Sequence, residues 1–220
     1  MEIDFGTYHH STPEESRRMR DRVESVFSGL LTSVYPADSE IRILDAGCGL
    51  GFLTSVAARC FPNSRITGVD IFGHGSLSDG TLEKAGANMK ALGIEPRVEL
   101  RRHDLMKPLD SGGAFDMAIS NLVFHNLGKK RYLAYETVFN VLKDRGYFIL
   151  GDLFPSLMED MEFFNGRCSI VREAETPALV LGILQLLFGG IIPGILLIIA
   201  YTKIGDSIRR NPRNQQNTFP

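Results

Sequence analysis

The stretch ILDAGCGLGF, from Ile43 to Phe52, decides the fold of this 220-residue chain. An apolar strand is predicted over residues 41–44 and a helix over 53–61, so the glycines lie between the two. Glycine allows the tight turn that this junction needs and lets the backbone approach a ligand closely. A loop of this kind predicts a nucleotide-like ligand at the carboxyl ends of the strands.

Strands and helices alternate along the chain after this loop. Further strands are predicted over 66–69, 98–101, 115–120 and 146–150, with helices over 81–92 and 129–142. Helices between consecutive strands predict an α/β fold with a doubly wound, mostly parallel sheet. Before them, Ser11 or Thr12 is expected to cap an N-terminal helix with Pro13 at its first position. We therefore assign residues 1–38 to an N-terminal helical cap.

The overall composition excludes several classes of protein. The formal net charge is −2 and the isoelectric point is near 6.2, so we expect no nucleic-acid partner. Three cysteines without metal-binding spacing predict a reducing compartment and no metal site. The polar N-terminus predicts no signal peptide.

Two kinds of nucleotide cofactor compete for the glycine loop. A dinucleotide site has the pattern G-x-G-x-x-G, whose third glycine would fall on Phe52. The chain instead has G-x-G-x-G, and Asp45 precedes it. About 20 residues further on, Asp70 ends the second predicted strand, where an acidic side chain can accept hydrogen bonds from ribose hydroxyls. The spacing therefore disfavours a dinucleotide.

Together with its neighbours, the loop LDAGCGLG (Leu44–Gly51) resembles motif I of the class I S-adenosylmethionine-dependent methyltransferases. The likeness continues in order with the ribose-binding strand end, the adenine-binding segment, the fourth strand and the entry to the fifth: GVDI (68–71), RHDL (102–105), FDMAISN (115–121) and LKDRGYFIL (142–150). The resemblance covers about residues 40–154. It implies a Rossmann-like methyltransferase fold with S-adenosylmethionine as the cofactor.

The resemblance also assigns individual residues to the cofactor. Those that it implies are Asp45, Gly47, Cys48, Gly49, Gly51, Asp70, Ile71, Asp104, Leu105 and Asn121. Two features depart from the family. The connection over 71–80 is longer than usual, as in a subset that includes membrane-attached enzymes, and the usual last two strands are expected to be missing.

Two residues are candidates for a direct role in methyl transfer. Asn121 ends the fourth strand beside the expected position of the methyl group. The segment LVFHN at 122–126 resembles a turn that is common in small-molecule methyltransferases, and His125 in it is a candidate general base. Such a base is needed only if the acceptor must lose a proton.

Residues at the chain's start and after the fifth strand are candidates for contacts around the substrate. Tyr8 and His9, followed by His10, are expected to fold over the cofactor as a lid, because the N-terminal segment often does so in this family. Asp152 lies at the carboxyl end of the fifth strand, where it could contact substrate or cap a turn.

A long apolar stretch, ALVLGILQLLFGGIIPGILLIIAY from Ala178 to Tyr201, follows the predicted catalytic domain. It exceeds the roughly 20 residues that a helix needs to cross a bilayer. Its Gly-Gly-Ile-Ile-Pro-Gly centre and the basic residues after it favour a helical hairpin over a single span, with both ends in the cytosol. We therefore predict a methyltransferase domain over 39–175, a C-terminal hydrophobic helix or helical hairpin over 176–202, and a polar tail over 203–220.

These features together predict an S-adenosylmethionine-dependent methyltransferase that is associated with a membrane, with its catalytic domain on the cytoplasmic side. Its expected acceptor is a hydrophobic or membrane-resident small molecule, such as a lipid or a quinone-like ring, with membrane lipid as a partner. One alternative is a soluble metabolite or protein as acceptor, with the apolar segment only an anchor. Another is a membrane protein that binds S-adenosylmethionine without catalysis. The sequence leaves the oligomeric state open.

Overall fold

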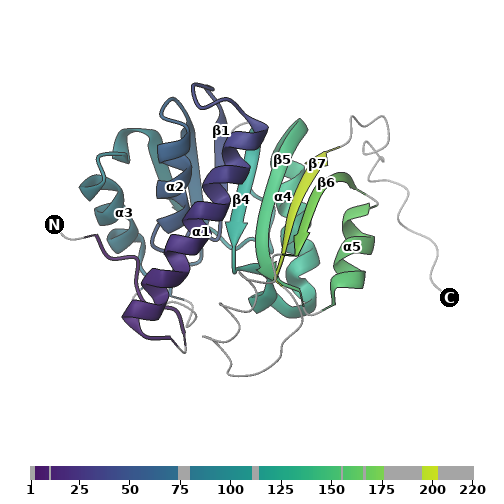
Figure 1. Cartoon of the computed structure of the whole chain (residues 1–220), viewed down its shortest axis with the longest axis horizontal. Helices are drawn as coiled ribbons and strands as arrows, with labels where there is room; N and C mark the ends of the chain where they lie inside the picture. Colours follow the sequence, from purple (N-terminus) through teal and green to yellow (C-terminus); the bar gives the residue numbers. More distant parts are fainter. Residues whose placement is uncertain are drawn as a thin grey trace.

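The computed structural model describes residues 3–9, 11–73, 80–110, 114–154, 156–165, 167–175 and 195–202. Their core is a seven-stranded sheet in the order β3-β2-β1-β4-β5-β7-β6 (Figure 1). The first five strands in this order are parallel, and β7 runs antiparallel to both of its neighbours. The strands are β1 (Arg42–Ala46), β2 (Arg65–Asp70), β3 (Val98–Arg102), β4 (Phe115–Asn121), β5 (Leu142–Leu153), β6 (Cys168–Glu175) and β7 (Ile195–Thr202).

Helices cover both faces of the sheet, as the alternation of elements predicts. The α-helices are α1 (Pro13–Val34), α2 (Phe52–Cys60), α3 (Leu82–Ala91), α4 (Arg131–Val141) and α5 (Leu157–Asn165), with short 3₁₀ helices η1 (Glu95–Arg97) and η2 (Phe124–Lys130). Successive strand residues face opposite layers, so Ile43 packs in the cluster with α1 and α2, and Leu44 packs in the cluster with α4 and α5. The mostly parallel, doubly wound fold is thus confirmed.

The N-terminal helix begins where the sequence predicts. The Thr12 hydroxyl accepts the Glu15 backbone N–H at 3.2 Å, and the Glu15 carboxylate accepts the Thr12 N–H at 2.7 Å. This reciprocal pair satisfies two backbone donors at the helix start. Buried residues from Val23 to Leu31 then fix α1 against α2 and the sheet.

The prediction for the C-terminal apolar stretch needs a correction. The usual last strands are present, and residues 195–202, which we predicted to belong to a helix or helical hairpin, form β7 between β5 and β6. A continuous apolar run is consistent with a buried strand as well as with a helix, and ILLIIAYT is rich in residues that favour strands. The remaining residues of the predicted segment, 176–194, lie outside the described part of the chain. None of the helices in the described part is both long and apolar enough to cross a membrane.

The strand order determines where the chain can build a site. The carboxyl ends of parallel strands lie at one edge of the sheet, which for β5 is at Leu153. Leu153 pairs with Ile195 at the start of β7, and Glu175 at the end of β6 pairs with Leu196. Both ends of the 176–194 connection therefore lie at the same edge of the sheet as the carboxyl ends of the parallel strands.

Candidate active site

A cavity of about 260 Å³ opens at this edge of the sheet. It lies outside the ends of β1, β2, β3 and β4, and Phe5 and Tyr8 from the N-terminal segment close part of it. The structure brings together most of the predicted cofactor residues, since the wall includes Asp45, Gly47, Cys48, Gly49, Asp70, Ile71, Asp104, Leu105 and Asn121. Gly51, His9, His125 and Asp152 are not among the described residues that line it.

The glycine loop can adopt its path only because its key positions lack a side chain. Gly47 has a φ of +81° and Gly51 a φ of +85°, in the left-handed region that favours glycine. A Cβ at Gly47 would overlap the Val123 side chain, and one at Gly51 would overlap Met89. The loop therefore fits closely between α3 and the turn after β4, with its backbone exposed to the cavity.

Asp45 is a buried carboxyl group in the wall of the cavity. Its Oδ2 accepts a hydrogen bond from the Thr54 hydroxyl at 2.5 Å. Burial raises the pKa of Asp45 to about 7, and the nearby charge of Asp70 acts in the same direction against the Thr54 hydrogen bond. A cationic ligand would favour the ionised form of this group.

Asp70 holds together the glycine loop and the residues that follow β2. Its carboxylate accepts the Gly49 N–H at 3.0 Å and the Phe72 N–H at 2.7 Å, which links the glycine loop to the end of β2. Phe72 has a φ of +48°, unusual for a bulky residue, and the Arg102 guanidinium donates to its carbonyl at 3.1 Å. Carboxylate oxygens have further lone pairs, so Asp70 can still accept ribose hydroxyls.

Residues 121–127, at and after the end of β4, contribute a second wall of the cavity, which borders the glycine loop at Val123. Asn121, Val123 and Leu127 face it, and Leu122 has a φ of +56°. The Leu122 N–H donates to the Gly151 carbonyl on β5 at 2.8 Å, which holds this strained residue in place. Strained backbone of this kind is concentrated at functional sites because the surrounding structure must be built to hold it.

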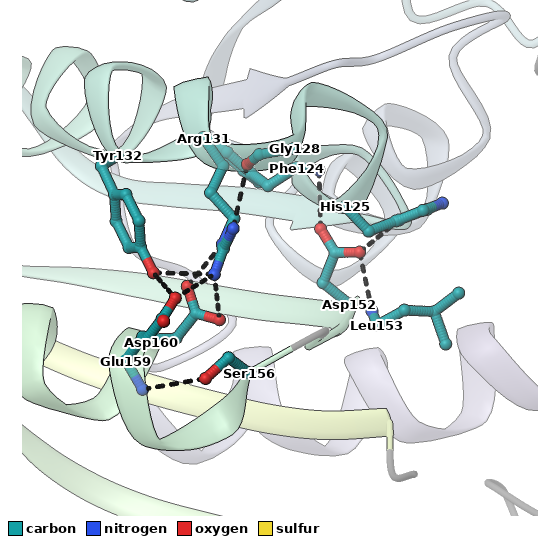
Figure 2. A network of polar contacts seen from close by, with 10 residues as sticks. All are labelled: Phe124, His125, Gly128, Arg131, Tyr132, Asp152, Leu153, Ser156, Glu159 and Asp160. Atoms are coloured by element: carbon teal, nitrogen blue, oxygen red, sulfur yellow. Dashed lines mark hydrogen bonds and ion pairs between the residues drawn. The ribbon is translucent and has the colours of Figure 1, made fainter. Parts of the chain in front are cut away.

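His125 and Asp152 form a hydrogen-bonded pair behind this wall. Figure 2 shows the Asp152 carboxylate between η2 and the end of β5, with His125 Nδ1 2.5 Å from its Oδ1. The Phe124 and Leu153 N–H groups also donate to Asp152, each at 2.7 Å. The Asp152 side chain is 1% exposed and that of His125 is 23% exposed. Because the carboxylate accepts hydrogen bonds, Nδ1 carries the proton in neutral His125, and Nε2 is left as the basic atom.

A second buried network anchors the other end of η2. The Arg131 guanidinium donates to both Asp160 oxygens, at 2.7 and 3.1 Å, and to the Gly128 carbonyl at 3.0 Å (Figure 2). The side chains of Arg131 and Asp160 are 4% and 0% exposed. The ion pair thus ties α5 to the turn that carries His125. Sequence reasoning missed it, because no local pattern connects these two residues.

Two residues of the N-terminal strap (residues 3–9), Phe5 and Tyr8, line the cavity, and the lid role of Tyr8 stays a prediction. The Phe5 ring packs edge-on against Phe52 with centroids 5.5 Å apart. The Tyr8 N–H donates to the Ser16 hydroxyl at 3.0 Å, and the Arg20 guanidinium lies over the Tyr8 ring. Burial raises the pKa of Tyr8 above its ordinary value. His9 belongs to the strap but does not line the cavity, and His10 lies outside the described residues.

The polar groups that line the cavity fit S-adenosylmethionine. Asp70 and Asp104 are acceptors at adjacent strand ends, where hydroxyls and an amino group can donate to them. Asp70 provides a carboxylate for a cationic cofactor, and such a cofactor would favour the ionised form of Asp45. The glycine loop lets a ligand approach the backbone closely, because Gly47 and Gly49 line the cavity without a side chain.

Comparisons with known proteins agree with this fit. The profile of a family described as "Methyltransferase domain" matches residues 37–186. The chain is 33% identical over 102 residues to a release factor glutamine methyltransferase of Koribacter versatilis, which is 46% of this chain and 33% of that protein. It is 30% identical over 124 residues to a malonyl-[acyl-carrier protein] O-methyltransferase of Legionella pneumophila, or 55% of this chain and 39% of that protein.

Another relative is named for a different kind of substrate. Ribosomal RNA small subunit methyltransferase C of Serratia proteamaculans is 31% identical over 113 residues, which is 51% of this chain and 30% of that protein. The chain therefore spans about a third of the length of these curated relatives. Among solved structures, N-methyltransferase NodS of Bradyrhizobium japonicum with S-adenosyl-L-homocysteine has a TM-score of 0.59 at 12% identity, covering 84% of this chain and 87% of NodS. At that identity the likeness concerns the fold alone.

Proposed function

The chain belongs to the methyltransferase domain family. We propose that it is an S-adenosylmethionine-dependent methyltransferase whose acceptor is an uncharged, largely apolar small molecule. The observation that carries the proposal is the charge of the cavity wall. The described residues of the wall include the carboxyl groups of Asp45, Asp70 and Asp104. They include no lysine or arginine. The described wall therefore offers no lysine or arginine to pair with a carboxylate or phosphate of an acceptor.

The apolar part of the wall supports the same acceptor. Leu122, Val123 and Leu127 line the side formed by the turn after β4, and Phe5 and Tyr8 contribute rings from the strap. Ligand sites for apolar molecules combine such a lining with a few polar groups that fix orientation. Asn121, at the end of β4, is the polar group that we propose for orienting the acceptor or the cofactor.

His125 is the general base that we propose for removing a proton from the acceptor. Bound S-adenosylmethionine supplies an electrophilic methyl group, and the protein must hold the acceptor in line with it. The adjacent η2 residues Asn126 and Leu127 line the cavity, so His125 lies in the turn that forms the wall. Asp152 keeps the ring oriented and stabilises the imidazolium that forms when Nε2 takes the proton. In this role Asp152 is a positioning residue and does not contact the substrate.

A membrane location is the second part of the proposal. Residues 176–202 contain no charged side chain, and the connection 176–194 leaves and rejoins the sheet at the active-site edge. Because Glu175 and Leu196 are paired, the two ends of this connection lie on one side of any membrane, which argues against a single span. We propose that the enzyme lies at the cytoplasmic surface of a membrane, with membrane lipid as a partner and the acceptor reaching the site from the bilayer.

Named relatives favour one alternative. They include methyltransferases of a protein, of an acyl-carrier protein substrate and of ribosomal RNA. A protein acceptor therefore remains the second candidate, and the exclusion of nucleic acid remains a prediction from the net charge of −2.

The test is to incubate the purified full chain and methyl-labelled S-adenosylmethionine with host membrane lipids or with host soluble extract, followed by extraction into organic solvent. We expect label in the organic phase with membranes, and loss of that label in the His125→Ala variant. Label only in protein or aqueous fractions would overturn the apolar acceptor and favour the alternative. Absence of label, with S-adenosylmethionine binding intact, would instead favour a binding protein without catalysis.

A further inference from the structure

Asn88 is a buried polar residue in the interior of α3, and it contacts both the strap and the glycine loop. Its Oδ1 accepts the Asp4 N–H at 3.0 Å, and its Nδ2 donates to the Asp4 carbonyl at 2.8 Å. The same Nδ2 donates to the Leu50 carbonyl at 3.0 Å. One side chain therefore pairs with the strap backbone as a neighbouring strand would, and at the same time holds the loop that faces the cofactor.

Helix propensity does not explain an asparagine at this position. Asparagine is unfavourable inside helices, where its side chain competes for backbone hydrogen bonds. Here Asn88 is 3% exposed, and the three hydrogen bonds satisfy its amide group. The neighbouring Met89 packs against the loop at Gly51, where no Cβ would fit. The same turn of α3 is thus fitted to the glycine loop by two separate contacts.

Other contacts also hold the strap: Phe5 packs on a cluster that includes Ala85 of α3, and the Arg20 guanidinium donates to the Gly6 carbonyl at 3.0 Å. Lys84 Nζ lies 2.8 Å from Asp4 Oδ2, but the Asp4 side chain is 59% exposed, so this ion pair contributes little. Phe5, the next residue along the strap, packs against Phe52 and lines the cavity. Asn88 therefore holds the backbone directly before Phe5, in addition to the packing of the Phe5 ring itself.

We propose that Asn88 is a positioning residue that couples closure of the N-terminal strap to the binding of S-adenosylmethionine. The glycine loop would hold the cofactor, the Leu50 carbonyl in this loop accepts from the Asn88 amide, and the same amide pairs with the Asp4 backbone next to Phe5. Coupling of this kind is reciprocal, so a closed strap strengthens cofactor binding to the same extent that the cofactor favours closure. The inference rests on the cofactor and not on the identity of the acceptor.

Two substitutions test the role of the Asn88 amide, so that the result does not depend on the correct folding of a single variant. Asn88→Asp keeps the size and the acceptor oxygen but removes both donated hydrogen bonds, and Asn88→Ala removes all three. We expect either change to weaken binding of S-adenosylmethionine by at least tenfold in calorimetric titration, and to speed its release. The matched control is Asn63→Ala, which removes a similar amide hydrogen bond to the Asp38 carbonyl far from the cavity, and should leave the affinity within twofold of the wild-type value.

Cleavage by chymotrypsin reports on the strap itself, because this protease cuts after aromatic residues such as Phe5 and Tyr8. S-adenosylmethionine should slow cleavage at these two positions in the wild-type protein and protect them much less in the Asn88 variants. A general loss of structure would instead raise cleavage along the whole chain and lower the unfolding temperature in proportion.

A double-mutant cycle with Phe5→Ala distinguishes coupling from two independent effects. If Asn88 acts through the strap, the loss of affinity in Asn88→Asp/Phe5→Ala will be clearly smaller than the product of the two single losses. Losses that multiply fully, or an Asn88→Asp affinity within twofold of the wild-type value, would overturn the proposal.

Discussion

The two walls of the cavity are built in different ways. On the cofactor wall, made by the ends of β1 and β2, positions are set by backbone atoms: Gly47 and Gly51 take left-handed conformations, and Asp70 accepts backbone N–H groups. On the wall that we propose for the acceptor (the acceptor wall), made by residues 121–127 and supported by β5, α4 and α5, positions are set by side-chain pairs that lie 27 and 29 residues apart in the chain. The cofactor wall thus depends on local backbone conformation, whereas the acceptor wall depends on packing between distant parts of the chain.

The largest expected effect is the loss of the ion pair behind the acceptor wall. Arg131→Met leaves the Asp160 carboxylate buried without its partner, and we expect a loss of about 3–5 kcal/mol in the free energy of unfolding. Urea unfolding measures this. The double variant Arg131→Met/Asp160→Leu should recover most of the loss, because apolar residues of similar volume can replace such a pair. A double variant as unstable as the sum of the single ones would show that this wall does not depend on the pair.

A backbone substitution should damage the cofactor wall instead. Gly47→Ala places a Cβ at a φ of +81° and against Val123, at a cost of roughly 2–4 kcal/mol from strain and overpacking. We expect a loss of affinity for S-adenosylmethionine of about a hundredfold or more by titration. The control is Gly86→Ala in α3, where the Cβ meets open space, and where alanine should stabilise the helix by about 0.5–1 kcal/mol. Equal affinities for both variants would contradict the account of this wall.

A substitution that removes the charge of Asp152 should lower turnover without changing the affinity for the cofactor. Asp152→Asn keeps an oxygen beside His125 but no longer stabilises its protonated form, so we expect kcat to fall about a hundredfold. Affinity for S-adenosylmethionine should stay within twofold, because Asp152 is absent from the described lining of the cavity. A variant that binds the cofactor poorly but turns over normally would reverse the assignment of the two walls.

The smallest expected effect comes from Asp45. Its pKa is raised to about 7 in the folded protein, whereas the unfolded chain loses this proton near pH 4. The folded state therefore binds more protons over this interval, and stability falls as pH rises, by about 1.4 kcal/mol between pH 6 and pH 8 from this group alone. Urea unfolding at pH 6, 7 and 8 should show this step in the wild-type protein. The step should be missing from Asp45→Asn and retained in Asp38→Asn, an exposed site outside the cavity. A step retained in Asp45→Asn would assign the pH dependence to another group.

The difference between local conformation and long-range packing also explains which features could be predicted from the sequence. The glycine loop, the first five strands and most of the cofactor residues follow from local patterns: glycine spacing, apolar runs and acidic residues at strand ends. His125 and Asp152 were recognised as separate candidates, but nothing in the chain's local pattern indicates that they form a pair. Arg131, Asp160 and Asn88 were missed because their roles depend on contacts between distant elements, although an asparagine inside a predicted helix is a signal that could have been used.

For residues 195–202 at the end of the C-terminal apolar stretch, the helix prediction was wrong for a related reason. Its length and lack of charge were counted as one unit, yet residues 195–202 are a strand whose partners lie in β5 and β6. Hydrophobicity alone does not distinguish a buried strand from a helix, and the partners that decide between them are far away in the chain.

The most direct test of the division into two walls is a crystal structure of the chain with S-adenosyl-L-homocysteine. The account predicts that the ribose lies against Asp70 and the adenine amino group against Asp104, with the sulfur facing Asn121 and η2. A ligand bound with its sulfur directed away from Asn121, or bound outside this cavity, would contradict it.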